Sequence, residues 1–269
     1  MLSSLPPVRR RLLLGTVAAV LVGVLVAVVL AVVGRAGGRS GPAGPVRQDR
    51  PGPVLLVPGY GGSTASLEVL AARFRMAGRD ATVVRMPGGG TGELDRQARV
   101  LDSAVRAELA AGAPSVDVVG YSAGGVVARL WAADHGGRDV ARRIVTLGSP
   151  HHGTQVAALG ASLLPGQCPA ACRELVPTSH LLARLNADET PDGPLWVSLW
   201  TEQDQVVTPP DSARLDGAVN IPVQGVCPDA RLDHGQLPAD RLVQRLVLGV
   251  LGAAAPTMPT AADCARLRS

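Results

Sequence analysis

The pentapeptide at residues 120–124 reads GYSAG and matches G-x-S-x-G, a pattern that presents a nucleophilic serine in many enzymes. It follows the apolar run at 116–119 and opens a helical run at 124–135, which is the strand–turn–helix setting the pattern requires. Glycines flank Ser122 because a tight, strained turn leaves no room there for side chains. We predict that Ser122 is a nucleophile at the carboxyl edge of a sheet. The alternative is a glycine-rich helix start with a capping serine.

A serine nucleophile needs a general base, and the chain order expected for this arrangement is serine, acid, histidine. Two histidines, His180 and His234, lie well beyond Ser122. His234 comes after the last apolar run and directly before the final helical run, where it can reach the carboxyl edge of the sheet. His180 would require the acid to come earlier, in an irregular region. We therefore predict His234 as the base.

The acid is expected directly after the strand that precedes His234. The apolar run at 195–200 is that strand, and the turn after it contains Glu202 and Asp204. Either carboxylate could orient His234 and stabilise its imidazolium form. Periodicity does not choose between them.

Acyl transfer also needs hydrogen-bond donors for the oxyanion that forms on the carbonyl oxygen. The backbone N–H of Ala123, next after Ser122, is one candidate. The other is the backbone N–H of Tyr60, in the glycine-rich loop 58–62 that follows the first apolar run. This chemistry requires neither a metal nor a cofactor, and we expect none.

Short apolar runs alternate with helical patterns from residue 53 onward, which predicts an α/β fold. We expect a minimal doubly wound, mostly parallel sheet of about six strands with helices on both faces. The predicted strands are 53–57, 81–86, 116–119, 143–147, 195–200 and 218–223. The predicted helices are 65–77, 93–111, 124–135 and 237–251. The irregular stretch 151–193 is predicted to be a cap or lid-like insertion.

Residues 12–33 are all apolar or small apart from one threonine, Thr16. A helix of about 22 residues can span a bilayer. Arg9–Arg11 precede the run, and the positive-inside rule keeps such residues cytoplasmic. We predict a cytoplasmic basic tail at 1–11 and a membrane anchor at 12–33.

A cleaved signal peptide is the alternative, although its apolar region would be shorter. Both interpretations export the catalytic domain predicted at 53–269, either as a single-pass membrane protein facing outward or as a secreted protein. Residues 34–52 are rich in Gly, Pro and Arg and are predicted to be a flexible linker.

The positive charge of the chain lies in its N-terminal part. The first 50 residues carry seven arginines and one acid, whereas the remainder carries 19 arginines and 21 acids. The predicted domain therefore has no excess of positive charge with which to hold phosphates, and nucleic-acid binding is not expected.

The four cysteines suit an exported protein, in which disulfides persist. We favour local pairing, Cys168 with Cys172 and Cys227 with Cys264, among the three possible connectivities. The spacing lacks histidine partners, so a zinc site is not expected.

From about residue 53 to residue 252 the sequence resembles the small bacterial triacylglycerol lipases and esterases of the α/β-hydrolase superfamily (lipase class 2). The segments that carry the resemblance are VLLVPGYGG, VDVVGYSAGG, VTLGSPHHGT, LWTEQDQVVTPPDSARLDGAVNIPVQGV and LDHGQLPADRLVQRLVLGVLG. The stretch 200–220 is the most specific, and it favours Asp204 over Glu202. The resemblance implies a Ser122–Asp204–His234 triad with Tyr60 and Ala123 as oxyanion donors.

The chain departs from the family pattern at Pro58, where many members have histidine, and at Tyr60, where an aliphatic residue is common. Both backbone groups remain, but the acyl pocket could be altered. The segment 165–186, with its two cysteines, resembles secreted members that carry a local disulfide. The apolar run near the N-terminus is not part of the family pattern.

The expected activity is hydrolysis of a lipid or small-molecule carboxylic ester through an acyl-enzyme. An acyltransferase acting on envelope lipids would use the same residues with an alcohol as acceptor. A catalytically inactive domain that binds lipid or a protein partner is the third interpretation. The aromatic content is only 2%, so the pocket is expected to be lined by Leu and Val, which suits acyl chains.

Overall fold

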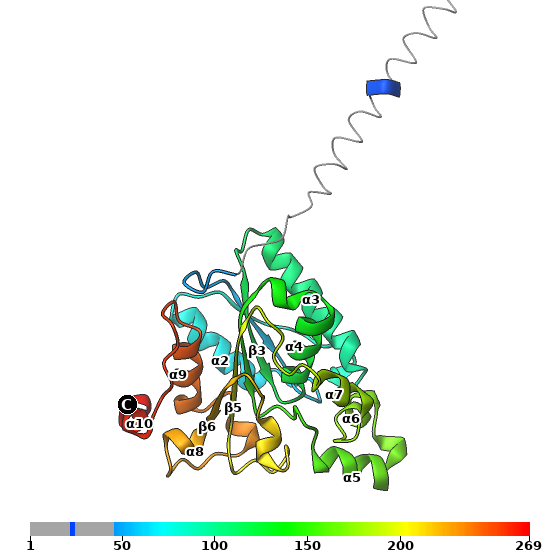
Figure 1. Cartoon of the computed structure of the whole chain (residues 1–269), viewed down its shortest axis with the longest axis vertical. Helices are drawn as coiled ribbons and strands as arrows, with labels where there is room; N and C mark the ends of the chain where they lie inside the picture. The colour runs from blue at the N-terminus through cyan, green and yellow to red at the C-terminus, as the bar shows by residue number, and fades with distance from the viewer. Residues whose placement is uncertain (1–21, 25–45) are drawn as a thin grey trace, which may run out of the picture. The chain divides into compact units, whose positions relative to one another are not determined.

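The computed structural model describes residues 22–24, which are helical, and residues 46–269 (Figure 1). The two stretches belong to separate compact units, divided between residues 44 and 45. The predicted basic tail at 1–11 lies outside the described residues, as does the predicted anchor at 12–33 apart from its short helical piece. Within the described ranges, every helix is too short or too polar to cross a bilayer.

Residues 46–269 are built around one sheet of six parallel strands in the order β2-β1-β3-β4-β5-β6. The strands are β1 (Val54–Val57), β2 (Ala81–Val83), β3 (Val116–Tyr121), β4 (Ala141–Leu147), β5 (Leu195–Trp200) and β6 (Val219–Pro222). Most of their residues are buried, as expected for parallel strands that are covered on both faces. The predicted α/β architecture is confirmed.

Helices cover both faces of this sheet (Figure 1). The helices α2 (Ala65–Met76) and α9 (Arg241–Val250) pack on one face, and α3 (Leu94–Ala110) and α4 (Ala123–Asp134) pack on the other. Each face of the sheet has its own hydrophobic core. Alternate residues of a strand belong to the two cores, because successive side chains point to opposite faces. Because the strands are parallel, their carboxyl ends lie at one edge of the sheet, where loops from different parts of the chain meet.

The predicted insertion between β4 and β5 consists of short helices rather than irregular chain. It contains α5 (Gln155–Leu163), α6 (Ala170–Glu174) and α7 (His180–Leu185). Arg129 of α4 is buried and donates to the carbonyl oxygens of Leu185 and Glu189 and to the side chain of Asn186. These bonds satisfy backbone acceptors at the end of α7 and fix the insertion to the helix that follows Ser122.

The remaining elements are short. They are α8 (Val223–Val226), α10 (Cys264–Arg268) and the 3-10 turns η2 (Pro87–Gly90), η3 (Gly137–Asp139), η4 (Pro165–Gln167), η5 (Pro210–Ala213), η6 (His234–Gln236) and η7 (Ala261–Asp263). Disulfides join Cys168 to Cys172 and Cys227 to Cys264, so the favoured local pairing is confirmed. The second disulfide ties the C-terminal segment to the end of α8.

The closing helix is shorter than predicted. It was expected over 237–251, but α9 begins at Arg241. The side chain of Asp240 accepts from the N–H of Val243 at 3.1 Å and caps the helix there. Strand β2 is also shorter than the predicted 81–86, ending at Val83.

Buried guanidinium groups hold the amino edge of the sheet together. Arg142 is fully buried and forms an ion pair with Asp117 at the start of β3. It also donates to the carbonyl oxygens of Gln48 (2.9 Å), Leu251 (2.7 Å) and Gly252 (2.9 Å). Part of the predicted linker, from residue 46 onward, thus lies against the sheet.

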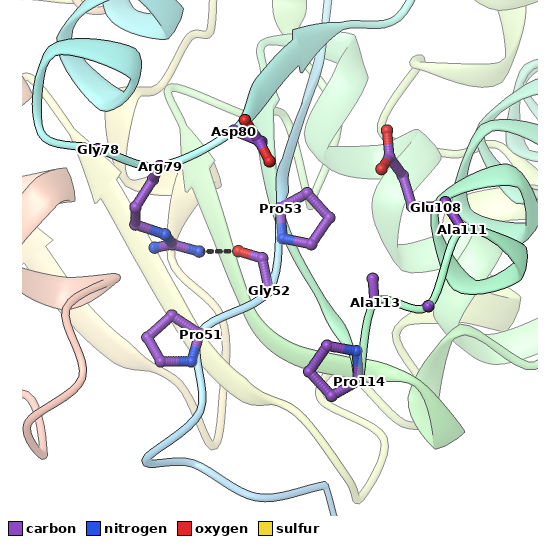
Figure 2. A pocket seen from close by; sticks show the side chains of 11 residues that line it. Pro51, Gly52, Pro53, Gly78, Arg79, Asp80, Glu108, Ala111, Ala113 and Pro114 are labelled. Atoms are coloured by element: carbon purple, nitrogen blue, oxygen red, sulfur yellow. Dashed lines mark hydrogen bonds between the residues drawn. The ribbon is translucent and has the colours of Figure 1, made fainter.

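A pocket opens at the same amino edge (Figure 2). Its walls come from residues 51–53, 78–80, 108 and 111–114. Arg79 donates to the carbonyl oxygen of Gly52 there and forms an ion pair with Asp117. Some of the residues that line this pocket come directly before β1 and β3 in the sequence. The pocket therefore lies at the opposite end of the strands from Ser122.

Candidate active site

The turn from β3 into α4 holds Ser122 in a strained conformation. Its φ of 54° is the one positive value found outside glycine in the described residues. A Cβ on Gly120 would lie 2.5 Å from Gly125, and one on Gly124 would lie 2.3 Å from the carbonyl oxygen of Val57. A side chain at Gly120 or Gly124 would therefore collide with neighbouring backbone, as the sequence pattern predicted. Such strain is typical of sites where a side chain must be presented in one orientation.

Ser122 and His234 are in hydrogen-bond contact. The Ser122 Oγ lies 3.0 Å from the Nε2 of His234, although 112 residues separate them in the chain. The other ring nitrogen, Nδ1, lies 2.7 Å from the Oδ2 of Asp204. The structure thus brings together the three side chains predicted as a triad, in one hydrogen-bonded line at the carboxyl edge of the sheet.

The structure distinguishes the two candidate acids. Asp204 is 5% exposed, and its Oδ1 accepts from the N–H groups of Val206 (2.9 Å) and Val207 (2.8 Å). These bonds leave Oδ2 for His234. Glu202, two residues earlier, is exposed and makes no side-chain contact with His234. The position of Asp204 agrees with the choice that the resemblance favoured.

Gly148, directly after β4, makes the close approach of Asp204 to His234 possible. It has a φ of 52°. A Cβ there would lie 3.2 Å from both the Asp204 Oδ2 and the His234 Nδ1, and 2.6 Å from the side chain of Leu237. A larger residue would therefore press on the contact between the two side chains.

The first loop lies directly against Ser122. A Cβ on Gly59 would be 2.7 Å from the Ser122 Cβ and 3.3 Å from its Oγ. The next backbone N–H, that of Tyr60, is therefore close to Ser122, and Ala123 begins α4 on the other side. In the described chain, neither N–H donates to a protein acceptor. Both sequence-predicted oxyanion donors thus lie beside Ser122 with unused hydrogen-bonding capacity.

Tyr121 is a site residue that the sequence did not reveal. Its hydroxyl donates to the backbone carbonyl oxygen of His234 at 3.2 Å, and the two rings lie 5.1 Å apart between centroids. Burial, together with the carboxylates of Asp204 and Asp233, raises the pKa of Tyr121 to about 12. Its place in the pattern, directly before the serine, gave no indication of this contact, because that position has no required residue type.

The other four histidines are engaged elsewhere or are exposed. His180 is exposed on α7, whereas the other three pair as follows: His135 with Asp95, His151 with Thr146, and His152 with Glu189. His151 is fully buried and its Nδ1 has no hydrogen-bond partner. Burial lowers the pKa of His151 well below its ordinary value, with smaller contributions from Arg129 and His152.

Apolar side chains are exposed on α5. Val156, Leu159 and Leu163 are 47%, 58% and 71% exposed. The start of α5 is joined to the loop that holds Asp204, because the Thr154 hydroxyl donates to the carbonyl oxygen of Val206 at 2.6 Å. The start of α5 therefore lies next to the loop that holds Asp204.

Solved structures of similar fold include two lipases. The mature lipase BlEst2 of Bacillus licheniformis superposes with a TM-score of 0.62 at 20% identity, over 80% of this chain and 95% of the lipase. Lipase B of Aspergillus fumigatus superposes with a TM-score of 0.63 at 15% identity, over 81% of this chain and 56% of the lipase. The fold is that of an α/β-hydrolase. The chain spans only about half of the fungal lipase and of the BlEst2 propeptide form, of which it covers 54%.

At the sequence level, a family model described as a PGAP1-like alpha/beta domain matches residues 83–162. These residues include Ser122 but neither Asp204 nor His234. No curated protein sequence matches the chain. The expectation of an α/β-hydrolase related in structure to bacterial lipases is met by the fold.

Proposed function

We propose that this α/β-hydrolase cleaves carboxylic esters with Ser122 as nucleophile, His234 as general base and Asp204 as the carboxylate that orients the base. The observation that carries the proposal is the hydrogen-bonded line from the Ser122 Oγ to His234 Nε2 (3.0 Å) and from His234 Nδ1 to Asp204 (2.7 Å). A buried carboxylate on Nδ1 directs the free lone pair of Nε2 towards the serine hydroxyl.

In the first half of the reaction, His234 takes the Ser122 proton as the Oγ attacks the ester carbonyl carbon. The carbonyl π electrons move to oxygen, and the N–H groups of Tyr60 and Ala123 bind the resulting oxyanion. When the carbonyl re-forms, the bond to the alcohol oxygen breaks, and His234 gives its proton to the leaving alcohol. An acyl-Ser122 ester remains.

In the second half, water replaces the alcohol. His234 removes a proton from the water as its oxygen attacks the acyl carbon, and the same oxyanion site stabilises the second tetrahedral intermediate. Collapse returns the proton to Ser122 and releases the carboxylic acid. The chain's own groups account for each proton transfer in this cycle.

We propose esters with apolar acyl chains as the substrate class. The exposed apolar residues Val156, Leu159 and Leu163 of α5, a helix whose start contacts the loop of Asp204, support this choice, because they offer contact area to hydrocarbon. The lipases of similar fold are consistent with it. A series of p-nitrophenyl esters of increasing chain length should give kcat/KM that rises from acetate to octanoate.

The central test compares Ser122→Ala with Ser103→Ala, which removes a serine hydroxyl from the exposed face of α3. Ser122→Ala should abolish p-nitrophenyl ester hydrolysis and labelling by a fluorophosphonate probe, with the melting temperature retained. Ser103→Ala should keep both activities. Undiminished turnover in Ser122→Ala would overturn the assignment. Incubation with an alcohol acceptor tests acyl transfer, and predominant transfer over hydrolysis would replace the hydrolase proposal.

We also propose that residues 12–33 anchor the catalytic unit to the cell membrane with Ser122 outside the cytoplasm. The length of the apolar run and the preceding Arg9–Arg11 support this topology. N-terminal sequencing of the protein from membranes should return a start upstream of residue 12. A start between residues 34 and 52 would indicate a cleaved signal peptide instead.

A further inference from the structure

Tyr121 and Ser122 are consecutive residues, and both contact His234. The Ser122 Oγ meets the ring at Nε2 (3.0 Å), whereas the Tyr121 hydroxyl donates to the backbone carbonyl oxygen of the same histidine (3.2 Å). The tyrosine ring also lies beside the imidazole, with centroids 5.1 Å apart and the planes tilted by 32°. His234 is therefore held by its backbone and by its side chain from the end of one strand.

This convergence depends on the strained turn. Successive side chains of a strand point to opposite faces, so two neighbours do not ordinarily reach the same partner. Ser122 leaves the strand conformation, with φ 54° and ψ −127°. Tyr121 still ends β3 and packs against the core on the α2 and α9 face. The turn brings the Ser122 hydroxyl to the histidine that the tyrosine already contacts.

The turn that carries His234 is otherwise held by local bonds. The side chain of Asp233 caps η6 by accepting from the N–H of Gln236 at 3.0 Å. The N–H of Leu237 donates to the His234 carbonyl oxygen at a long 3.3 Å. The Tyr121 hydroxyl adds a bond of long sequence separation to that same oxygen and uses neither ring nitrogen. This bond therefore links His234 to the end of β3. It leaves both ring nitrogens of His234 to Ser122 and Asp204.

We propose that Tyr121 is a positioning residue, which holds the His234 imidazole in line with Ser122 and stabilises the imidazolium formed during the reaction. This inference rests on the proposed function, in which His234 is the base. The hydroxyl fixes the backbone of η6. The ring places aromatic π density next to the imidazole, and such density favours a cation.

The protonation state of Tyr121 suits this role. Because burial and the nearby carboxylates raise its pKa to about 12, the phenol keeps its proton wherever a histidine base is active, so it remains a donor. The titratable groups that face the imidazole are Asp204, at Nδ1, and Tyr121, with Asp233 preceding it on the same turn. A change in the titration of His234 on replacing Tyr121, with both aspartates retained, therefore reports on the ring.

The test uses full-length Tyr121→Phe and Tyr121→Leu. Tyr121→Phe removes only the hydroxyl, so kcat should fall about three- to tenfold with KM unchanged, as expected for one neutral hydrogen bond. Tyr121→Leu also removes the ring. Its kcat should fall further, and the acidic limb of the kcat/KM profile should move down by about half a pH unit. Thr190→Val is the matched control, since it removes a hydroxyl that donates to a backbone carbonyl (Asp216, 2.9 Å) away from the site.

A second readout does not depend on turnover. NMR titration of His234 in a Ser122→Ala background should give a lower pKa with Tyr121→Leu and an unchanged pKa with Tyr121→Phe. Wild-type kcat in both variants would overturn the positioning role. A loss of kcat in Tyr121→Leu with no shift in either titration would overturn the stabilisation of imidazolium. If Ser122→Ala retained turnover, the proposed function would fail, while the NMR titration would still decide whether Tyr121 controls His234.

Discussion

The Oδ2 of Asp204 lies 2.7 Å from the Nδ1 of His234 across 30 residues of chain. The second oxygen of the carboxylate is held by two backbone N–H groups, so the acid has one orientation. We predict that Asp204→Asn lowers kcat by about 10³-fold or more, because an amide favours the wrong tautomer of the imidazole. Steady-state kinetics on p-nitrophenyl butyrate measure the effect. Glu202→Gln, two residues away and exposed, should keep wild-type kcat; the reverse pattern would make Glu202 the acid.

Gly59 can be tested as the residue that lets the first loop approach the nucleophile. A methyl group there would lie 2.7 Å from the Ser122 Cβ, so Gly59→Ala must displace the loop that carries the Tyr60 N–H. We expect kcat/KM to fall about 10²-fold, as for loss of one oxyanion donor. Gly92→Ala is the control, since a Cβ at Gly92 meets nothing within 4 Å. Equal activities in the two variants would contradict the close approach.

His151 should make stability depend on pH. Burial lowers its pKa in the folded protein, whereas the unfolded chain binds a proton below a pH of about 6.5. The free energy of unfolding should therefore fall as the pH drops below about 6.5, by at most about 1.4 kcal/mol per pH unit, and be unaffected by this group above that pH. Urea denaturation at pH 7.5 and 5.5 measures the difference. His151→Gln should reduce the difference and the exposed His180→Gln should not; equal pH dependence in all three proteins would exclude His151 as its source.

Asp117 should be essential for stability, because it is the carboxylate partner of Arg79 and Arg142. Its side chain and that of Arg142 are completely buried. We predict that Asp117→Asn costs about 3–5 kcal/mol, since it leaves buried positive charge without compensation. Asp49→Asn breaks an exposed ion pair with Arg47 and should leave stability almost unchanged. Chemical denaturation of both variants checks this, and similar losses would contradict the importance of burial.

The sequence was sufficient for much of the fold because each strand is a short apolar run bounded by turn residues. It also placed Ser122 and His234, since the order of elements fixes which loops reach the carboxyl edge. Asp204 and Glu202 could not be separated by periodicity, because burial and backbone donors decide between two carboxylates in one turn. The tyrosine–histidine contact was not predicted either, since it joins residues 113 positions apart.

The arginines were harder to interpret than the apolar residues. All 26 positive residues of the chain are arginine. Such a composition indicates a bias in codon usage and does not by itself identify arginines with a structural role. Three of them, Arg79, Arg142 and Arg143, nevertheless meet at the amino edge, where they donate to backbone carbonyl oxygens. No local sequence pattern identifies these three arginines, because their hydrogen-bond acceptors come from the predicted linker and from the end of α9.

These guanidinium bonds also define where the unit that carries Ser122 can be shortened. Both the main chain and the side chain of Gln48 are engaged, the first by Arg142 at 2.9 Å and the second by the carbonyl oxygen of Arg142 at 3.1 Å. Removing all residues before β1 would remove a hydrogen-bond acceptor, the carbonyl oxygen of Gln48, from the buried guanidinium of Arg142. A shortened protein for crystallisation should therefore start near residue 45, and a protease that trims the full-length chain should stop short of Gln48.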